Sequence, residues 1–183
     1  APDLIESGGV GGSSTIKSHH NVGLDIGLPA IAPLAHLFKH EVRALGRSLG
    51  LPASATERMP FPGPGLLVRV FGMPVTRERL NLLRQADALA EGLIRNAGFA
   101  EQFEQLVVAL CGAKTVGVKG DERDYGYAVV VRAIRTDDFM TARPVSFPPE
   151  LRIALTQKLT QLPGVTRVWF DETPKPPATI EME

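Results

Sequence analysis

The segment Met59 to Gly65, which reads MPFPGPG, constrains the fold of this chain more than any other. It holds three prolines and two glycines in seven residues. Proline cannot donate the backbone hydrogen bond that a helix interior or a central strand requires. The segment therefore predicts a break between two folded parts at about residue 59. Two interpretations stay open and can coexist: a linker between domains, and the rigid wall of a binding pocket.

One helix is predicted before this break. Apolar residues recur at helical spacing from Leu34 to Leu49, and Pro33 suits the first turn. Gly50 fits the left-handed position that ends a helix. His36 and His40 lie one turn apart, which is metal-ligand spacing, but no third ligand is near them in the sequence. We therefore expect them to be solvated histidines on the helix surface.

After the break, the pattern predicts strand, helix, strand, strand, helix, strand. Thr76 is expected to cap the first helix, and a polar turn is expected over residues 117–127. This order lacks the repeated βαβ units of a doubly wound sheet and predicts an α+β fold, a small mixed or antiparallel sheet with helices on one face. So small a sheet leaves a face or an edge uncovered, which favours pairing with a second copy. The strands are expected at 66–71, 106–110, 128–134 and 165–170, and the helices at 77–97 and 148–162.

Composition excludes several classes of function. Lys and Arg number 20 and Asp and Glu number 20, so no chain-wide basic surface is available for nucleic acid. No run of 18 apolar residues is present, so we expect no membrane span. Cys111 is the only cysteine, which favours a reducing, cytoplasmic location. The chain starts at Ala1 without Met, so we expect either a removed Met or a piece of a longer protein.

The first 20 residues contain a Gly/Ser-rich hinge followed by reactive side chains. The hinge SGGVGGSST lacks the Gly-Lys-Ser/Thr ending of a Walker A loop and the aspartate of the SGGxDS pyrophosphatase loop. Lys17, His19 and His20 follow it, and such residues can neutralise phosphoryl charge and move protons. A mobile lid and a plain solvated loop remain open. Asp3 and Glu6 precede the hinge at a spacing that can hold Mg²⁺ or orient the lysine.

The end of the chain carries a second polar motif, KPPATIE, from Lys175 to Glu181. Disorder is the default expectation for such a tail. The alternative is that the two prolines present Lys175 to a phosphate and Glu181 to a hydroxyl group. Further basic residues gather in the third quarter of the chain, where we expect mostly solvated strand edges, with one or two completing an anion site. These residues are Lys114, Lys119, Arg123, Arg132 and Arg135.

Four collinear segments together resemble the GMP synthetase family, the glutamine-hydrolysing ligases of purine synthesis. They read IKSHHNVG, PFPGPGL followed by VRV, VGVKGDERDYGYAVVVRA and KPPATIEME. The resemblance implies an enzyme with amidotransferase, ATP-pyrophosphatase and dimerisation domains. In that family, ATP and Mg²⁺ activate xanthosine monophosphate (XMP) as an adenylyl intermediate, and ammonia derived from glutamine then gives GMP.

The resemblance also implies a division of this chain and a role for each motif. Residues 1–59 correspond to the end of the ATP-pyrophosphatase domain with its lid, and residues 60–183 to the dimerisation domain, which binds XMP and forms a homodimer. The lid residues are Asp3, Glu6, Lys17, His19 and His20. In the XMP site, Lys175 lies at the phosphate and Glu181 at the ribose, with Ile180 beside them and Lys119 reaching across the dimer.

Three hypotheses remain at this point. The chain is part of a GMP synthetase, or a fragment that dimerises and binds XMP without catalysis, or a purely structural dimerisation protein. The chain departs from the family's pattern in two places. It reads LDIGLPA after SHHNVG, where relatives usually read GLPE, and it has Met182 where an aromatic residue is usual.

Overall fold

The computed structural model describes residue 31 and residues 33–182, which fall into two compact units. One unit runs to Arg58 and includes Asp137–Met140. The other consists of Met59–Thr136 and the chain from Thr141 onward. None of the helices in the described part of the chain is both long and apolar enough to cross a bilayer.

The described helices of the first unit are α2 (Lys39–Ser48) and α3 (Ala53–Thr56). α2 is shorter than the helix predicted from the sequence, because residues 33–36 form a turn. It begins where the Glu41 carboxylate accepts the Phe38 backbone N–H at 2.7 Å, which satisfies a donor at the helix N-terminus. Its predicted end at Gly50 is confirmed, with a φ of 79°. His36 and His40 are exposed, as expected.

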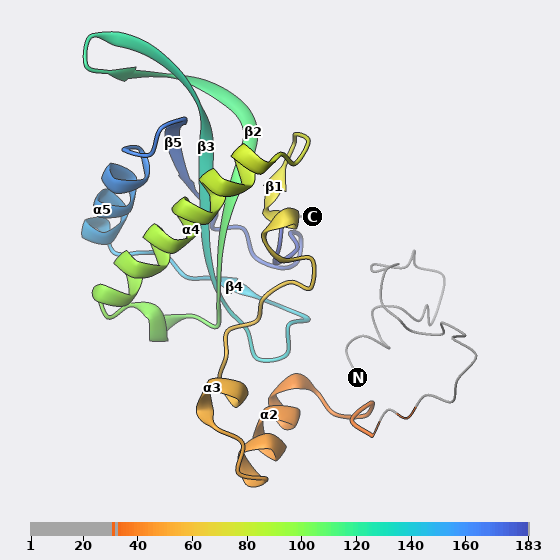
Figure 1. The fold of residues 1–183 in the computed structure, drawn as a ribbon. Coiled ribbons are helices and arrows are strands. Elements are labelled where there is room, and N and C mark those ends of the chain that lie inside the picture. The colour runs from red at the N-terminus through yellow and green to blue at the C-terminus, as the bar shows by residue number, and fades with distance from the viewer. Residues whose placement is uncertain (1–30, 32, 183) are drawn as a thin grey trace. The chain divides into compact units, whose positions relative to one another are not determined.

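The second unit is built on a five-stranded mixed sheet (Figure 1). β2 and β3 form an antiparallel hairpin at its centre, and β3 also pairs with β4 and β5. β1 runs parallel to β2, and β5 runs parallel to β3. The α+β class is confirmed, although the sheet has five strands rather than three or four. The strands are β1 (Val70–Phe71), β2 (Gln105–Lys119), β3 (Glu122–Arg135), β4 (Arg143–Pro144) and β5 (Val165–Phe170).

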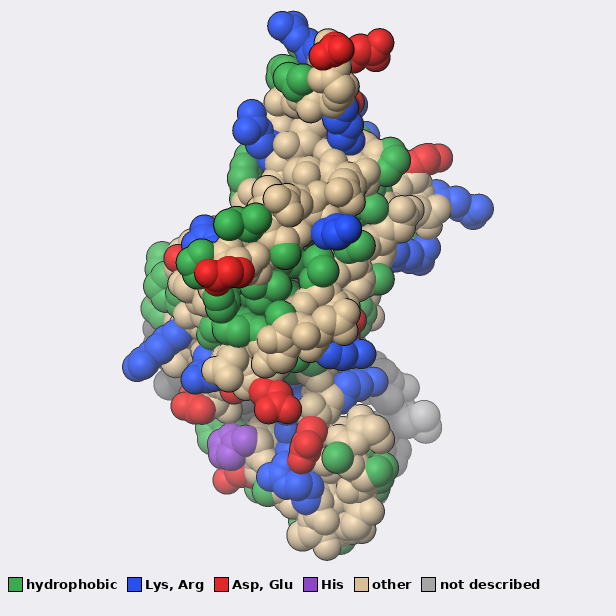
Figure 2. Space-filling view, turned by 90° about the vertical axis from the view of Figure 1, so that its left-hand side faces the viewer, with side chains coloured by type: hydrophobic (Ala, Val, Ile, Leu, Met, Phe, Trp, Pro, Cys, Tyr) green, Lys and Arg blue, Asp and Glu red, His purple; other side chains and the backbone are tan. Residues whose placement is uncertain are grey.

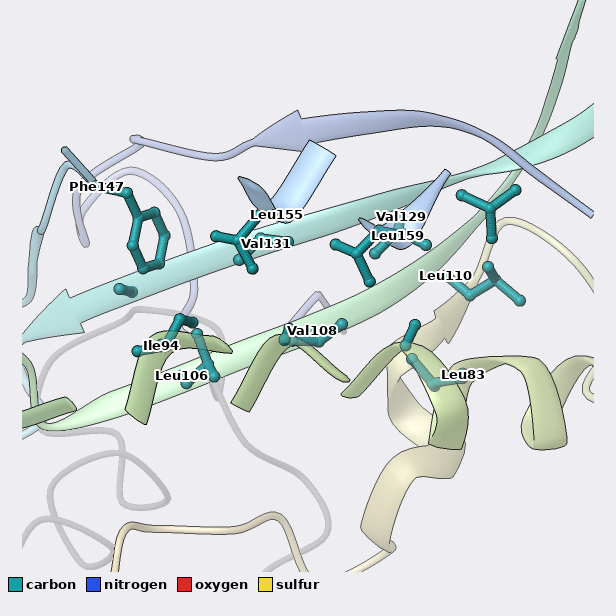
Figure 3. Packing of buried hydrophobic residues seen from close by; sticks show 14 of the residues in the cluster. Leu83, Ile94, Leu106, Val108, Leu110, Val129, Val131, Phe147, Leu155 and Leu159 are labelled. Carbon is teal, nitrogen blue, oxygen red and sulfur yellow. The ribbon is translucent and has the colours of Figure 1, made fainter. Parts of the chain in front are cut away.

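Two helices, α4 (Arg77–Asn96) and α5 (Pro149–Leu159), cover one face of this sheet (Figure 1). The Thr76 hydroxyl accepts the Arg79 N–H at 3.3 Å, which confirms the predicted cap. Alternate residues of β2 and β3 point toward the helices, as the two-residue period of a strand requires. Figure 3 shows this core, in which Leu83 and Ile94 of α4 lie over Val108 and its neighbours.

Two segments differ from the sequence-based expectation. Residues Gly65–Arg69, predicted to begin a strand, form a 3₁₀ helix, η1. Pro62 and Pro64 precede it and Gly65 has a φ of 70°, so the backbone is turning here and only β1 is extended. The predicted turn over 117–127 is also wrong, because β2 and β3 continue as paired strands to Lys119 and Glu122.

The strands of this hairpin extend beyond the helices as an arm (Figure 1). Its tip carries charged side chains of both signs (Figure 2). Because many residues of the arm are exposed, their composition is that of a loop even though their backbones pair. A second 3₁₀ turn, η2 (Ala100–Gln102), precedes β2.

The sheet face opposite the helices has a smaller apolar cluster of Val107, Ala109 and Val130. Ile180 and Met182 pack against it, together with Phe71 and Cys111. Ile180 and Met182 belong to residues 171–182, here called the tail, whereas Phe71 and Cys111 belong to β1 and β2. The tail is therefore a packed part of the domain, and the default expectation of disorder is wrong for these residues.

Candidate functional site

A buried arginine joins the Pro/Gly-rich segment to the tail. Arg69, at the end of η1, has a side chain only 2% exposed. Its Nε donates to Glu181 Oε2 at 3.0 Å and its Nη2 to Glu181 Oε1 at 3.1 Å. The Phe61 ring lies 5.0 Å from the guanidinium carbon, within cation–π range. The two motifs that stand out most in the sequence thus meet at one side chain.

The Glu181 carboxylate is held in a fixed orientation but is not saturated. Gln105, at the start of β2, donates its side-chain N–H to Oε1 at 2.7 Å. Oε1 therefore accepts two hydrogen bonds and Oε2 accepts one from the groups described. A carboxylate oxygen can accept about two. The Glu181 side chain is 19% exposed, and Oε2 has the capacity for one more hydrogen bond.

A second carboxylate balances the Arg69 charge from the helix side. Asp87 of α4 lies 3.5 Å from Arg69 Nη1. Burial raises the pKa of Asp87 above its ordinary value, the Arg69 charge opposes that rise, and Glu91 and Glu181 add to it. One cation is thus shared by two acids, Glu181 from the tail and Asp87 from α4.

A second buried arginine, Arg132 of β3, holds the other end of the tail. Its side chain is 0% exposed, so the expectation of a solvated strand edge is wrong for this residue. Its Nη1 donates to Asp171 Oδ2 at 3.0 Å and to the Thr173 carbonyl at 2.6 Å, and its Nη2 donates to the Thr179 carbonyl at 3.1 Å. Three tail residues that are separated in sequence are therefore fixed by one guanidinium.

The charge of Arg132 is matched by Asp171. Burial raises the pKa of Asp171, but hydrogen bonds from Thr173 and the charge of Arg132 outweigh it, so the pKa lies below its ordinary value. Lys175 lies between the two carbonyls that Arg132 binds. Its backbone pairs with Ala142, donating at 2.9 Å and accepting at 3.0 Å. The backbone that carries Lys175 is thus fixed on both sides.

The structure brings together only some of the predicted site residues. Lys175, Ile180 and Glu181 lie in one tail on one face of the sheet. Lys119 lies at the far end of β2, where it pairs with Asp124 at 3.2 Å. An extended strand rises about 3.3 Å per residue, so the 14 steps from Gln105 to Lys119 span up to about 46 Å along β2 in the same copy. A shared site would therefore need a second copy, as the resemblance implies.

The remaining predicted residues lie outside the part of the chain that the structure describes. These are Asp3, Glu6, Lys17, His19 and His20. Among the described residues, no group of three or more His, Cys, Asp or Glu side chains is placed to hold a metal ion.

Sequence reasoning missed four residues of this site: Arg69, Asp87, Gln105 and, in its buried role, Arg132. A signal was present for Arg132, because it interrupts the apolar run AVVVRAI within a predicted buried strand. A charge at such a position needs a buried partner. The partner, Asp171, follows 39 residues later, and local patterns do not identify it.

Comparison with known proteins identifies the family to which the chain is similar. Residues 92–182 match the family described as the GMP synthase C-terminal domain. This chain carries a C-terminal domain of the GMP synthase family. The matched region contains β2, β3 and the tail, and hence Gln105, Arg132 and Glu181.

Curated relatives extend the match over the whole chain. All of it aligns with proteins named "GMP synthase [glutamine-hydrolyzing]". One from Caldanaerobacter subterraneus is 50% identical, one from Thermus thermophilus 48% and one from Aeropyrum pernix 45%. The chain spans only 36–37% of the length of these relatives. The family match covers most of the second unit, and the similarity to these relatives extends over the remaining residues of both units.

Proposed function

We propose that this chain is the C-terminal part of a GMP synthase and supplies its XMP-binding and dimerisation elements. The observation that carries the proposal is the contact of Arg69 with Glu181. It joins the segment that follows PFPGPGL to the KPPATIE tail, and the resemblance assigns that tail to the nucleotide site. The identity of 45–50% to proteins named GMP synthase supports the same conclusion.

The tail residues can recognise a nucleoside monophosphate in distinct ways. Lys175 is proposed to bind the phosphate, where a lysine makes charge-assisted hydrogen bonds to the dianion. Glu181 is proposed to accept a ribose hydroxyl at Oε2, since Arg69 and Gln105 already orient the carboxylate. Ile180 packs on the apolar cluster of the same sheet face and is proposed to line the site.

The lid is the second part of the proposal. Lys17, His19 and His20 would close over the nucleotides, and Lys17 would neutralise charge that develops at the transferred phosphoryl group. Asp3 and Glu6 would hold the Mg²⁺ that accompanies ATP. The parent enzyme would use ATP, XMP and ammonia derived from glutamine, in the cytoplasm. The reaction also needs domains that these 183 residues do not supply.

A comparison of the complete enzyme with the isolated chain tests this function. The complete enzyme is expected to bind XMP in a calorimetric titration and to form GMP from XMP, ATP and ammonia. The isolated chain is expected to form no GMP, because it lacks the loop that grips the departing pyrophosphate. Failure of the complete enzyme to bind XMP would overturn the proposal. GMP formation by the isolated chain would contradict the proposal that other domains are needed for the reaction.

A further inference from the structure

Arg132 is placed to shape the tail loop without touching a ligand. Its side chain is fully buried, so a nucleotide bound at the surface cannot reach it. Its hydrogen bonds go to the Asp171 carboxylate and to the carbonyls of Thr173 and Thr179. The two carbonyls belong to residues before and after Lys175 in the sequence. Because both bind the same guanidinium, the residues between them form a loop.

Other contacts of the same loop leave Lys175 little backbone freedom. Both backbone hydrogen bonds to Ala142 fix its main chain. The Ala178 N–H donates to the Pro174 carbonyl at 3.0 Å, which closes the loop from within. Holding a side chain in its binding geometry before the ligand arrives reduces the entropy lost on binding.

The burial of a cation here calls for a reason beyond stability. An apolar side chain at this strand position would avoid the desolvation cost of a guanidinium. The adjacent β3 residue on the same face, Val130, packs in the apolar cluster against which Ile180 and Met182 lie. Arg132 instead places three donated hydrogen bonds where no apolar residue can, and all three end in the tail.

We propose that Arg132 is a positioning residue for phosphate recognition: it sets the loop that presents Lys175 to the phosphate of XMP. This inference rests on the proposed function. Arg69 does the equivalent for the Glu181 carboxylate, and its side-chain contacts with Glu181 are separate from those that Arg132 makes.

XMP titration of the complete enzyme tests this inference with matched variants. Arg132→Met is expected to weaken XMP binding about 10- to 100-fold and to lower its salt dependence to that of Lys175→Ala. Arg132→Lys is expected to be intermediate, because an ammonium lacks the planar fork that reaches both carbonyls. Arg167→Met, an exposed arginine of β5, is the control and is expected to bind XMP normally.

Two double-variant experiments distinguish a positioning role of Arg132 from a general loss of stability. In a Lys175→Ala background, Arg132→Met is expected to cause no further loss, because its route to the ligand is already gone. In a Glu181→Ala background, the full loss is expected to remain. If Arg132→Met fails to fold, Asp171→Asn replaces it, with an expected loss of about 2- to 5-fold that again disappears in the Lys175→Ala background.

The outcomes distinguish the inference from the function on which it rests. Absence of XMP binding by the unsubstituted enzyme refutes the proposed function and the inference with it. Normal binding by the unsubstituted enzyme and by the folded Arg132 variants refutes the inference alone. The inference is also refuted if losses from Arg132 and Lys175 multiply, or if the Arg132 loss disappears in the Glu181→Ala background as well.

Discussion

Arg69 and Glu181, 112 residues apart in sequence, form a two-pronged ion pair in which each Glu181 oxygen accepts one guanidinium N–H. Fork-to-fork geometry of this kind is among the stronger polar contacts in proteins. Because Arg69 is almost completely buried, the pair also determines whether its positive charge is compensated. Glu181 therefore has a structural role besides the proposed contact with ribose.

Glu181 should stabilise the fold through its contact with Arg69. Glu181→Ala should lower the free energy of unfolding by about 3 kcal/mol, because it leaves a buried guanidinium with only the more distant Asp87 as a carboxylate partner. Glu181→Gln keeps one acceptor and should cost less. Urea denaturation followed by Trp169 fluorescence measures both. Equal stability of Glu181→Ala and the parent would contradict this role of the pair.

Lys175→Ala should weaken XMP binding about 10- to 100-fold while leaving the domain folded. The side chain leaves from a tail loop, so no core cavity forms. Calorimetric titration at low and high salt should give a smaller difference at high salt, because salt screens phosphate contacts near the surface. Lys158→Ala, an exposed lysine of α5, is the control. A loss independent of salt would argue against a phosphate contact.

Asp171 gives the domain a specific acid sensitivity. Its pKa is lowered in the folded state from an ordinary value of 3.8, so the folded state favours the charged form. Its stabilising effect is present above the unfolded pKa and is lost as the pH falls through the lower, folded pKa. Asp171→Asn should therefore flatten the loss of stability below about pH 4.

Asp87 should affect the pH dependence of stability in the opposite direction. Its pKa is raised by burial, so its contribution to stability is greatest at low pH and falls as the pH rises through that pKa. Asp87→Asn should make the acid-induced loss steeper. Thermal unfolding from pH 3 to pH 7 compares the two variants. Identical pH profiles would show that folding does not shift the pKa values of the two carboxyl groups in opposite directions.

Two glycines should respond to alanine in opposite directions. A Cβ at Gly126 would lie 2.6 Å from the Gly164 carbonyl oxygen and 2.8 Å from Thr166 Cγ2, so Gly126→Ala should cost about 2 kcal/mol. A Cβ at Gly92, inside α4, meets nothing within 4 Å. Gly92→Ala should therefore stabilise by about 0.5–1 kcal/mol. The melting temperature of Gly126→Ala should lie below that of the parent, and that of Gly92→Ala should lie above it.

The chain should form a homodimer in solution. The β2–β3 arm exposes Val118 at 77% and Tyr125 at 56%, and a small domain gains stability by covering such apolar surface with a second copy. Sedimentation equilibrium at micromolar concentration is expected to give about twice the mass of 19.7 kDa. A single monomeric species across the concentration range would contradict this expectation.

Local patterns predict those parts of the fold that depend on near neighbours. α4 matches the expectation within one residue and keeps its Thr76 cap, and β5 matches at both ends. β4 was not expected, because two residues carry no periodic pattern. The paired strands of the arm were mistaken for a turn, because their exposed polar residues lack the alternation of a half-buried strand.

Local sequence likewise predicts some residues of the candidate site and not others. Lys175 and Glu181 stand out in the sequence because they flank a rigid Pro-Pro pair. Arg69 does not stand out, and Arg132 stands out only as a charge within an apolar run, because their carboxylate partners lie 112 and 39 residues away. Pairings of this kind are fixed by tertiary packing, which no local window of sequence contains.

The central position of β3 also sets an order in which the domain can assemble. β2 and β3 are joined by a short turn between Lys119 and Glu122, so their pairing closes almost no loop. β5 reaches β3 only across α5, and β1 reaches β2 only across α4, and such distant pairings cost more chain entropy and form more slowly. The hairpin is therefore the natural nucleus for refolding. We expect the tail to dock last, because its two buried arginine anchors lie in η1 and β3.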